Sequence, residues 1–257
     1  MRDAARSRSS LELRDLSLEA AGKTLLRSFS LSMHSGEMIA LLGPNGGGKT
    51  STIRAALGLH KPAAGSVLLE QRPLFDFTQR ERAAHIAWLP QMGFDREPIP
   101  AIDLVASARF RFGESLAAAR KHALAAMKAV AASQLAAQHI DTLSGGESQR
   151  VALACLLAQE ASLLLLDEPA NHLDPAQQQF VYRFLGHRWE AGDGILCVTH
   201  DINLLRHLGP PEQTSRIRVV GMDAGTGRFE LRYDAPELKD ALEALYAEGE
   251  DKGKRAD

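Results

Sequence analysis

The stretch GPNGGGKT, at Gly43–Thr50, decides most of what can be inferred about this chain. It fits the pattern G-x-x-x-x-G-K-[ST], which is typical of a loop that holds the phosphates of a nucleotide. The apolar run Met38–Leu42 precedes it and is expected to form a buried strand, and Ser51–Leu57 follows it and is expected to form a helix. A strand, a glycine-rich loop and a helix, in this order, are the context that the motif requires.

The residue types of this loop suit the binding of a nucleoside triphosphate. Successive backbone N–H groups can surround the phosphates, and glycines lack a Cβ, so the backbone can approach the ligand closely. Lys49 supplies a full positive charge, the Thr50 hydroxyl can bind Mg²⁺, and the helix N-terminus adds partial positive charge. The predicted nucleotide-binding residues of the loop are Gly43, Pro44, Asn45, Gly46, Gly47, Gly48, Lys49, Thr50 and Ser51.

Four leucines, Leu163–Leu166, lead into an acidic pair. Four consecutive apolar residues favour a strand that is buried on both faces, as in a parallel sheet. Asp167 would then lie at the carboxyl end of this strand, beside the phosphate loop, and bind Mg²⁺. Glu168 is expected to point the other way by strand alternation and to orient an attacking water. The alternative is a strand end that carries two solvated acids.

The run Ser144–Glu147 has the S-x-x-E form of a capping box and predicts a helix through Gln149–Leu157. Its two glycines would weaken the first turn of that helix by roughly 1 kcal/mol each. They are explained if a phosphate group must approach the exposed N–H groups of the helix closely. A helix cap without any ligand is the alternative.

The runs GPNGGGKT, LSGGESQR, LLLLDEPANHLD and CVTHD occur in this order and resemble the nucleotide-binding subunit of an ABC transporter. The resemblance extends from about Leu11 to about Arg206. It implies ATP hydrolysis by a head-to-tail homodimer, in which each ATP touches the phosphate loop of one chain and Ser144, Gly145 and Gly146 of the other. Such a pairing closes as a two-fold dimer because each chain contributes both surfaces.

Three further residues are matched through the resemblance. Gln91 in WLPQ resembles the glutamine that reaches Mg²⁺ and the attacking water, and His200 in VTHD resembles the histidine that contacts the γ-phosphate. Asp174 in NHLD resembles a loop aspartate at the dimer interface, and before Pro175 it also suits a helix N-cap, so we expect it to serve both roles. Gln91 and His200 could instead be ordinary loop and strand-end residues. The expected catalytic residues are Glu168, His200, Gln91 and Lys49, and the expected metal ligands are Thr50, Gln91 and Asp167.

The resemblance also implies the fold, an α/β P-loop NTPase core with a mostly parallel sheet, an N-terminal antiparallel β subdomain and a helical insertion subdomain. We predict one domain over residues 8–248, with a core lobe over 8–90 and 158–248 and a helical subdomain over 91–157. Residues 249–257 are charged and are expected to be a disordered tail. With 257 residues and 45% hydrophobic content, the chain has ample material for a core.

Composition indicates which partners to expect. The formal net charge is −2 and the sequence has no basic stripe, so nucleic-acid binding is not expected. No stretch approaches the roughly 20 apolar residues of a membrane span, and the first ten residues lack the apolar centre of a secretory signal. We therefore expect a cytoplasmic chain, and the resemblance implies that a separate transmembrane permease subunit holds it on the inner face of the cell membrane.

The runs AAHIAWLPQ, IPAIDLVASARFRF and ANHLDPAQQ resemble the subunits of importers for iron–siderophore, haem or cobalamin. The expected function is therefore to power import of such a substrate. Two alternatives stay open, a soluble single-cassette ATPase that is not coupled to transport, and a subunit of an exporter or a lipid-trafficking system.

The segment from Gln91 to Phe112 is expected to form the cleft that receives a short helix of the permease. It mixes apolar and basic side chains, and the alternative is that its apolar residues only pack the core of the helical subdomain. The residues concerned are Met92, Phe94, Ile99, Phe110 and Phe112 with Arg96, Arg109 and Arg111.

One position departs from the family pattern. Ala20 stands where relatives usually carry an aromatic residue that stacks on adenine, and no Phe, Tyr or Trp occurs between Met1 and Arg27. We therefore expect modest ATP affinity and weak discrimination between bases.

Overall fold

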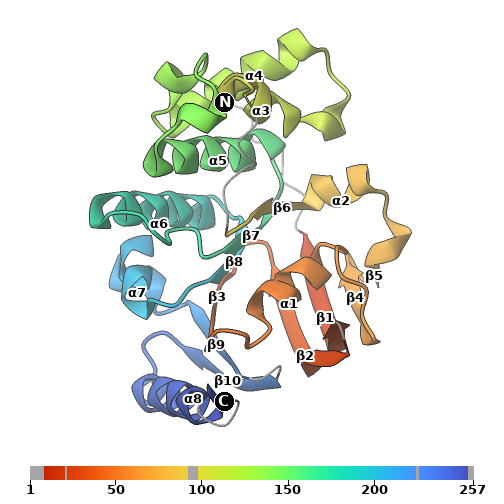
Figure 1. Ribbon diagram of the computed structural model, residues 1–257, viewed down its shortest axis with the longest axis vertical. Helices are drawn as coiled ribbons and strands as arrows, with labels where there is room; N and C mark the ends of the chain where they lie inside the picture. The colour runs from red at the N-terminus through yellow and green to blue at the C-terminus, as the bar shows by residue number, and fades with distance from the viewer. Residues whose placement is uncertain (1–8, 21, 92–97, 224–225, 254–257) are drawn as a thin grey trace.

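A six-stranded sheet forms the centre of the protein in the computed structural model, which describes residues 9–20, 22–91, 98–223 and 226–253 (Figure 1). Its strand order is β10-β9-β3-β8-β7-β6, and every neighbouring pair is parallel except β9 with β10. The mostly parallel sheet expected from the sequence is therefore confirmed. The strands are β3 (Met38–Leu42), β6 (Ile86–Leu89), β7 (Leu163–Asp167), β8 (Gly194–Val198), β9 (Arg218–Asp223) and β10 (Thr226–Arg232).

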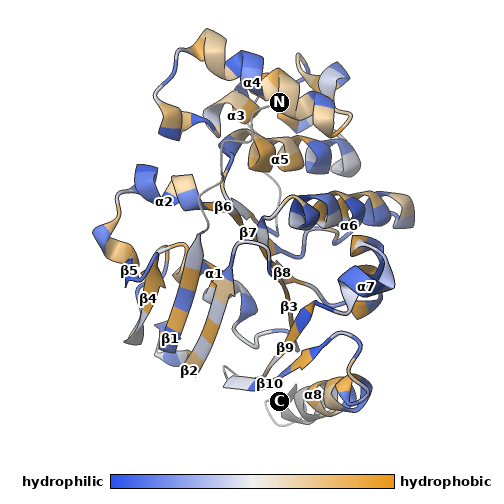
Figure 2. Ribbon diagram, turned by 180° about the vertical axis from the view of Figure 1, so that it is seen from behind, coloured by the Kyte–Doolittle hydropathy of each residue, from blue (hydrophilic) through white to orange (hydrophobic). Residues whose placement is uncertain are grey.

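A second, antiparallel sheet of four strands comes mainly from the N-terminal part of the chain, as expected. Its order is β2-β1-β4-β5, and the strands are β1 (Ser10–Ala20), β2 (Lys23–His34), β4 (Ala64–Leu69) and β5 (Arg72–Pro73). Leu11 and Leu13 of β1 are buried while Arg14 is exposed, which is the alternation of a sheet with one covered face. Figure 2 shows the same change between apolar and polar residues along β1.

The helices cover both faces of the central sheet. The α-helices are α1 (Lys49–Ala56), α2 (Gln79–His85), α3 (Ala101–Ser107), α4 (Leu116–Ala129), α5 (Gly145–Gln159), α6 (Pro175–Glu190), α7 (Pro211–Thr214) and α8 (Leu238–Gly253). Short 3₁₀ helices are η1 (Leu74–Asp76), η2 (Phe110–Phe112), η3 (Ser133–Leu135), η4 (Ile140–Thr142) and η5 (Ile202–Leu208). Helices α3, α4 and α5 gather at one end of the molecule, and α8 lies at the other (Figure 1).

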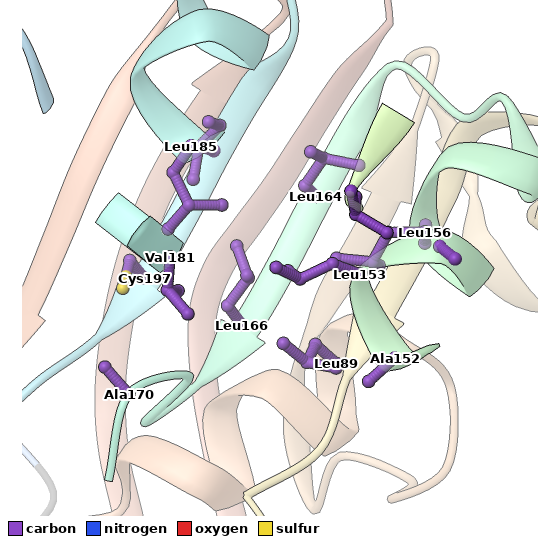
Figure 3. Close-up of a cluster of buried hydrophobic side chains, with 14 of the residues drawn as sticks. Leu89, Ala152, Leu153, Leu156, Leu164, Leu166, Ala170, Val181, Leu185 and Cys197 are labelled. Carbon is purple, nitrogen blue, oxygen red and sulfur yellow. The ribbon is translucent and has the colours of Figure 1, made fainter. Parts of the chain in front are cut away.

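Two hydrophobic cores lie on opposite faces of the central sheet, because successive strand residues point to opposite sides. Leu164 and Leu166 of β7 pack in the core that contains α5 and α6 (Figure 3). Leu163 and Leu165 pack in the other core, with α1 and the antiparallel sheet. Burial of one leucine side chain stabilises a fold by about 1.5–3 kcal/mol, so this strand is fixed from both faces.

The segment after His200 and the C-terminal segment are both helical. Residues 202–208 form a 3₁₀ helix, which starts after Asp201, whose side chain accepts a hydrogen bond from the backbone N–H of Asn203. Helix α8 continues to Gly253, so it includes residues 249–253 of the segment expected to be a tail; residues 254–257 lie outside the described part. Glu, Lys and Ala are good helix formers, and a charged composition does not by itself end a helix. None of the helices in the described ranges has the length and apolar character needed to span a bilayer.

Candidate active site

The candidate site lies at the edge of the central sheet where four parallel strands end. The phosphate loop follows β3, Gln91 comes two residues after β6, Asp167 ends β7, and His200 comes two residues after β8. Because the carboxyl ends of parallel strands meet at one edge, residues far apart in the sequence reach the same region. This edge is where open α/β sheets bind their ligands.

Backbone geometry explains the glycines of the phosphate loop. Gly43, Gly46 and Gly48 have φ angles of 151°, 76° and 92°, which side-chain-bearing residues rarely adopt. A Cβ on Gly48 would lie 2.7 Å from the carbonyl oxygen of Leu25, and one on Gly43 would collide with the carbonyl oxygen of Met222. The loop therefore needs glycine both for its dihedral angles and for close packing against β2 and β9.

Lys49 is buried within the loop that it follows. Its Nζ atom donates hydrogen bonds of 2.8 Å each to the carbonyl oxygens of Gly43 and Pro44, and the residue is only 6% exposed. Burial lowers the pKa of Lys49 below its usual value, while the nearby carboxylates of Glu168 and Asp167 act in the opposite direction. The ammonium group is thus held by the backbone of the loop, near two carboxylates.

Asp167 is a buried carboxylate with an unsatisfied oxygen. It is 1% exposed, and its Oδ1 atom has no hydrogen-bond partner among the described residues. Burial raises the pKa of Asp167 above its usual value, although the neighbouring Thr50 hydroxyl acts in the opposite sense. An unpaired buried oxygen destabilises a fold by about 1–3 kcal/mol, and a divalent cation would satisfy it. Carboxylate and hydroxyl oxygens are ligands that Mg²⁺ accepts, so Asp167 with Thr50 fits this ion.

The position of Glu168 is set by a turn and not by the strand. β7 ends at Asp167, and Glu168 has a φ of 50°, in the left-handed region. Its backbone N–H donates a 3.0 Å hydrogen bond to the carbonyl oxygen of Val198 in β8. The alternation argument for its direction therefore does not apply, because Glu168 is already outside the strand.

Three side chains contact the Glu168 carboxylate. Nε2 of Gln91 donates to Oε2 at 2.8 Å, and Nε2 of His200 lies 2.6 Å from Oε1. The amide of Asn171 also donates to Oε2, at 2.7 Å. The structure thus brings together three residues singled out from the sequence and adds Asn171, to which the sequence analysis gave no role. Its only signal was its place in the run DEPANHLD, three residues after Glu168.

Ser144 caps α5 in the expected way. The Glu147 N–H donates to the Ser144 hydroxyl, and the Glu147 carboxylate accepts from the Ser144 backbone N–H at 2.9 Å, which completes the capping box. A Cβ on Gly145 would meet no atom of the described residues within 4 Å, and the nearest atoms to one on Gly146 belong to the flexible side chain of Gln177. Packing among the described residues therefore does not explain these glycines, whereas a ligand at the helix N-terminus would. α5 and α1 pack on opposite faces of the sheet (Figure 1).

Asp174 is the N-cap of α6. Its Oδ1 accepts a 2.9 Å hydrogen bond from the backbone N–H of Gln177, and Pro175 occupies the first helical position. The predicted capping role is confirmed, and the role at a dimer interface stays a prediction.

The segment expected to receive a permease helix is only partly described. Met92, Phe94 and Arg96 lie outside the described residues. The expectation that Arg109 lines a surface cleft is wrong, because it is 4% exposed and bonded inside the protein. Its partners are the Ala158 carbonyl oxygen at 2.8 Å, Glu160 at 2.8 Å and Glu114.

Two aromatic residues of the same segment do reach the surface. Phe110 is 54% exposed and Phe112 is 36% exposed. The Phe112 ring contacts the guanidinium groups of Arg109 and Arg111, at 4.0 and 3.9 Å from the ring centroid. These side chains remain candidates for contact with a partner.

Ala20 is the last residue of β1 and pairs with Lys23 at the turn into β2. This hairpin is the place where the family resemblance predicts the contact with adenine.

Comparison with known proteins agrees with this geometry. The family model described as ABC transporter matches residues 26–171, and a model of an AAA domain matches residues 140–206. The hemin import ATP-binding protein HmuV of Pseudomonas aeruginosa is 37% identical over 199 residues, which are 76% of this chain and 78% of that protein. The zinc import ATP-binding protein ZnuC of Pseudomonas fluorescens is 34% identical over 224 residues, which are 81% of this chain and 80% of that protein.

Solved structures give the same result. A dimeric bacterial ABC transporter cassette superposes with a TM-score of 0.76 at 26% identity and covers 88% of this chain and 99% of that chain. A post-hydrolysis state of such a cassette, bound to ADP and Pi, superposes with a TM-score of 0.73 at 25% identity and covers 88% of this chain and 99% of that chain. Given its phosphate loop, the acidic and histidine residues that meet it at one sheet edge, and these matches, this chain belongs to the ABC transporter family of ATP-binding proteins and is an ATPase.

Proposed function

We propose that this ATPase powers an importer and is held on the inner face of the cell membrane by a separate permease subunit. The relatives named for hemin import and zinc import, at 37% and 34% identity, support import as the direction of transport. The observation that supports a working ATPase most strongly is the Glu168 carboxylate, held between Gln91 and His200 beside the phosphate loop.

The proposed roles follow from position and chemistry. The phosphates lie on the loop Gly43–Ser51, where Lys49 meets their negative charge. Asp167, Thr50 and Gln91 would hold Mg²⁺, which would supply positive charge to the phosphate oxygens. Glu168 takes the proton of the attacking water, whose oxygen forms a bond to the γ-phosphorus as the bond to ADP breaks. His200 donates a hydrogen bond to the γ-phosphate.

A second copy of the chain is proposed to complete each site. Ser144, Gly145 and Gly146 of that copy contribute helix N–H groups and a hydroxyl to the γ-phosphate. The space beside Gly145 supports this role, because no atom of the described residues lies within 4 Å of a Cβ placed there. The dimeric arrangement of the structural neighbour at 26% identity supports it as well. Asp174 is proposed to contact the same interface.

For the transported substrate we propose the class that comprises iron–siderophore complexes, haem and cobalamin. Support comes from the hemin import relatives, and a zinc importer of similar identity keeps metal ions as the second candidate. The alternatives are a cassette without a permease, an exporter subunit and a lipid-trafficking subunit.

The test is reconstitution. The chain is co-expressed with a candidate permease, a polytopic membrane protein sought among the neighbouring genes, and the complex is placed in vesicles with ATP on the side of the cassette. Haem, a ferric siderophore, cobalamin and Zn²⁺ are offered separately on the opposite side with the matching binding protein. We expect ATP-dependent uptake of one of the first three. The proposal would be contradicted if the chain failed to co-purify with the permease, or if the complex transported the substrate away from the side of the cassette in an ATP-dependent way.

A further inference from the structure

We propose that Asn171 is a positioning residue for the carboxylate of Glu168. This inference rests on the proposed catalytic role of Glu168 and adds a residue to it. Asn171 is exposed in the loop between β7 and α6, and its amide donates a 2.7 Å hydrogen bond to Oε2 of Glu168, a side chain that is only 11% exposed.

The hydrogen bond that the side-chain oxygen of Asn171 accepts determines the orientation of its amide group. Its Oδ1 atom accepts a 2.9 Å hydrogen bond from the backbone N–H of His172. Because only the carbonyl end of an amide can accept this bond, the NH₂ end faces Glu168. The side chain is therefore fixed at both ends, and its donor points at the carboxylate.

The backbone between the two residues forms a tight turn. The Asn171 N–H donates a 3.1 Å hydrogen bond to the Glu168 carbonyl oxygen, and both Glu168 and His172 have left-handed backbones, with φ of 50° and 61°. Such residues are uncommon, and they persist where the surrounding contacts hold them. The two hydrogen bonds of the Asn171 side chain are contacts of this kind.

The other two hydrogen-bond partners of Glu168, Gln91 and His200, come from distant segments of the sequence and have other proposed roles. Gln91 and His200 are 77 and 32 residues away from Glu168 in the sequence. Gln91 is proposed to reach Mg²⁺, and His200 is proposed to reach the γ-phosphate. Asn171 belongs to the same turn as Glu168, so its bond can persist while the other two partners move. Asn171 then holds Oε2 of Glu168 and leaves Oε1 of Glu168 free to face the attacking water.

The test compares Asn171→Asp and Asn171→Ala with a matched control. Asn203→Asp changes an exposed asparagine whose amide likewise donates to a carboxylate, Oδ1 of Asp201, at 3.0 Å. Steady-state ATP hydrolysis with Mg²⁺ and binding of a fluorescent ATP analogue are measured for each variant, and thermal unfolding confirms folding. We expect both Asn171 variants to lose about tenfold or more in kcat, the effect of one hydrogen bond to a charged group, with KM and affinity within about twofold. The control should keep wild-type kcat.

A double mutant separates positioning from a general structural effect. If Asn171 acts through Glu168, adding Asn171→Ala to Glu168→Gln should not lower the residual rate further. Wild-type kcat in both Asn171 variants, or a further tenfold loss in the double mutant, overturns the inference and leaves the proposed function intact. Wild-type turnover in Glu168→Gln alone would instead overturn the proposed role of Glu168, and this inference with it.

Discussion

Nε2 of His200 lies 2.6 Å from Oε1 of Glu168, although the two residues are 32 positions apart in the sequence. They meet because β7 and β8 are parallel neighbours that end at the same edge of the sheet. If His200 stabilises the γ-phosphate, His200→Ala should lower kcat by about 100-fold, a magnitude typical of a lost donor at developing negative charge. Steady-state ATP hydrolysis checks this, with His122→Ala as a control on an exposed histidine of α4. An unchanged kcat in His200→Ala would contradict the assignment.

The buried charge of Asp167 gives a pH-dependent prediction. Its pKa is raised by burial, so the folded protein holds this proton more tightly than the unfolded chain does. Stability from this group is present at low pH and is lost as the pH rises through the raised pKa. At neutral pH, Asp167→Asn should therefore raise Tm by about 2–4 °C, corresponding to about 1 kcal/mol.

The same variant should lose ATP hydrolysis with Mg²⁺, because it removes a proposed metal ligand. Thermal unfolding is recorded without nucleotide or metal from neutral pH down to about pH 4, the usual aspartate range. The difference in Tm should shrink as the pH falls. A lower Tm than wild type at neutral pH would show that the charge is compensated by its surroundings.

Tyr182 links α6 to the segment that carries His200. Its hydroxyl donates a buried 3.0 Å hydrogen bond to Oγ1 of Thr199, and burial keeps the pKa of Tyr182 well above its usual value, so the hydroxyl remains protonated. Tyr182→Phe should destabilise the protein by about 1 kcal/mol and lower Tm by about 2–4 °C. Tyr233→Phe is the control, since that half-buried hydroxyl has no hydrogen-bond partner among the described residues. Equal Tm changes in both variants would contradict a specific role for the bond.

The main features of the fold and the site could be predicted from short apolar runs followed by chemically distinctive residues. Met38–Leu42 and Leu163–Leu166 mark buried parallel strands, and the loop and acidic pair that follow them therefore meet at one edge. Asn171 could not be predicted in the same way, since its contact with Glu168 depends on left-handed backbone angles that no local pattern specifies.

Arg109 shows that the local sequence also does not predict contacts between residues far apart in the chain. Its charge and its aromatic neighbours favour a surface role, but the carbonyl oxygen of Ala158 and the carboxylate of Glu160, at the end of α5, bind it inside the protein. These partners are about 50 residues away, as is common for tertiary contacts that override local patterns.

Ala20 predicts an unusual nucleotide preference. Without an aromatic residue at the end of β1, stacking worth about 1–3 kcal/mol is missing, while the phosphate contacts remain. We expect GTP hydrolysis within about tenfold of ATP hydrolysis, since about 1.4 kcal/mol corresponds to a factor of ten. Ala20→Tyr should bind ATP more tightly than wild type. Calorimetric titration of both proteins with ATP and GTP tests this, and a strong ATP preference in the wild type without gain in the variant would show that another group holds adenine.

The central claim is that two copies of this chain enclose ATP between the phosphate loop of one and the helix that starts at Ser144 of the other. The most direct measurement is light scattering on Glu168→Gln, which should bind ATP with hydrolysis slowed by about 100-fold or more. Scattering should show a monomer without nucleotide, a dimer with ATP, and a monomer again when Ser144→Arg is added. A protein that stays monomeric with ATP, even with the permease present, or one whose dimer survives Ser144→Arg, would contradict the account.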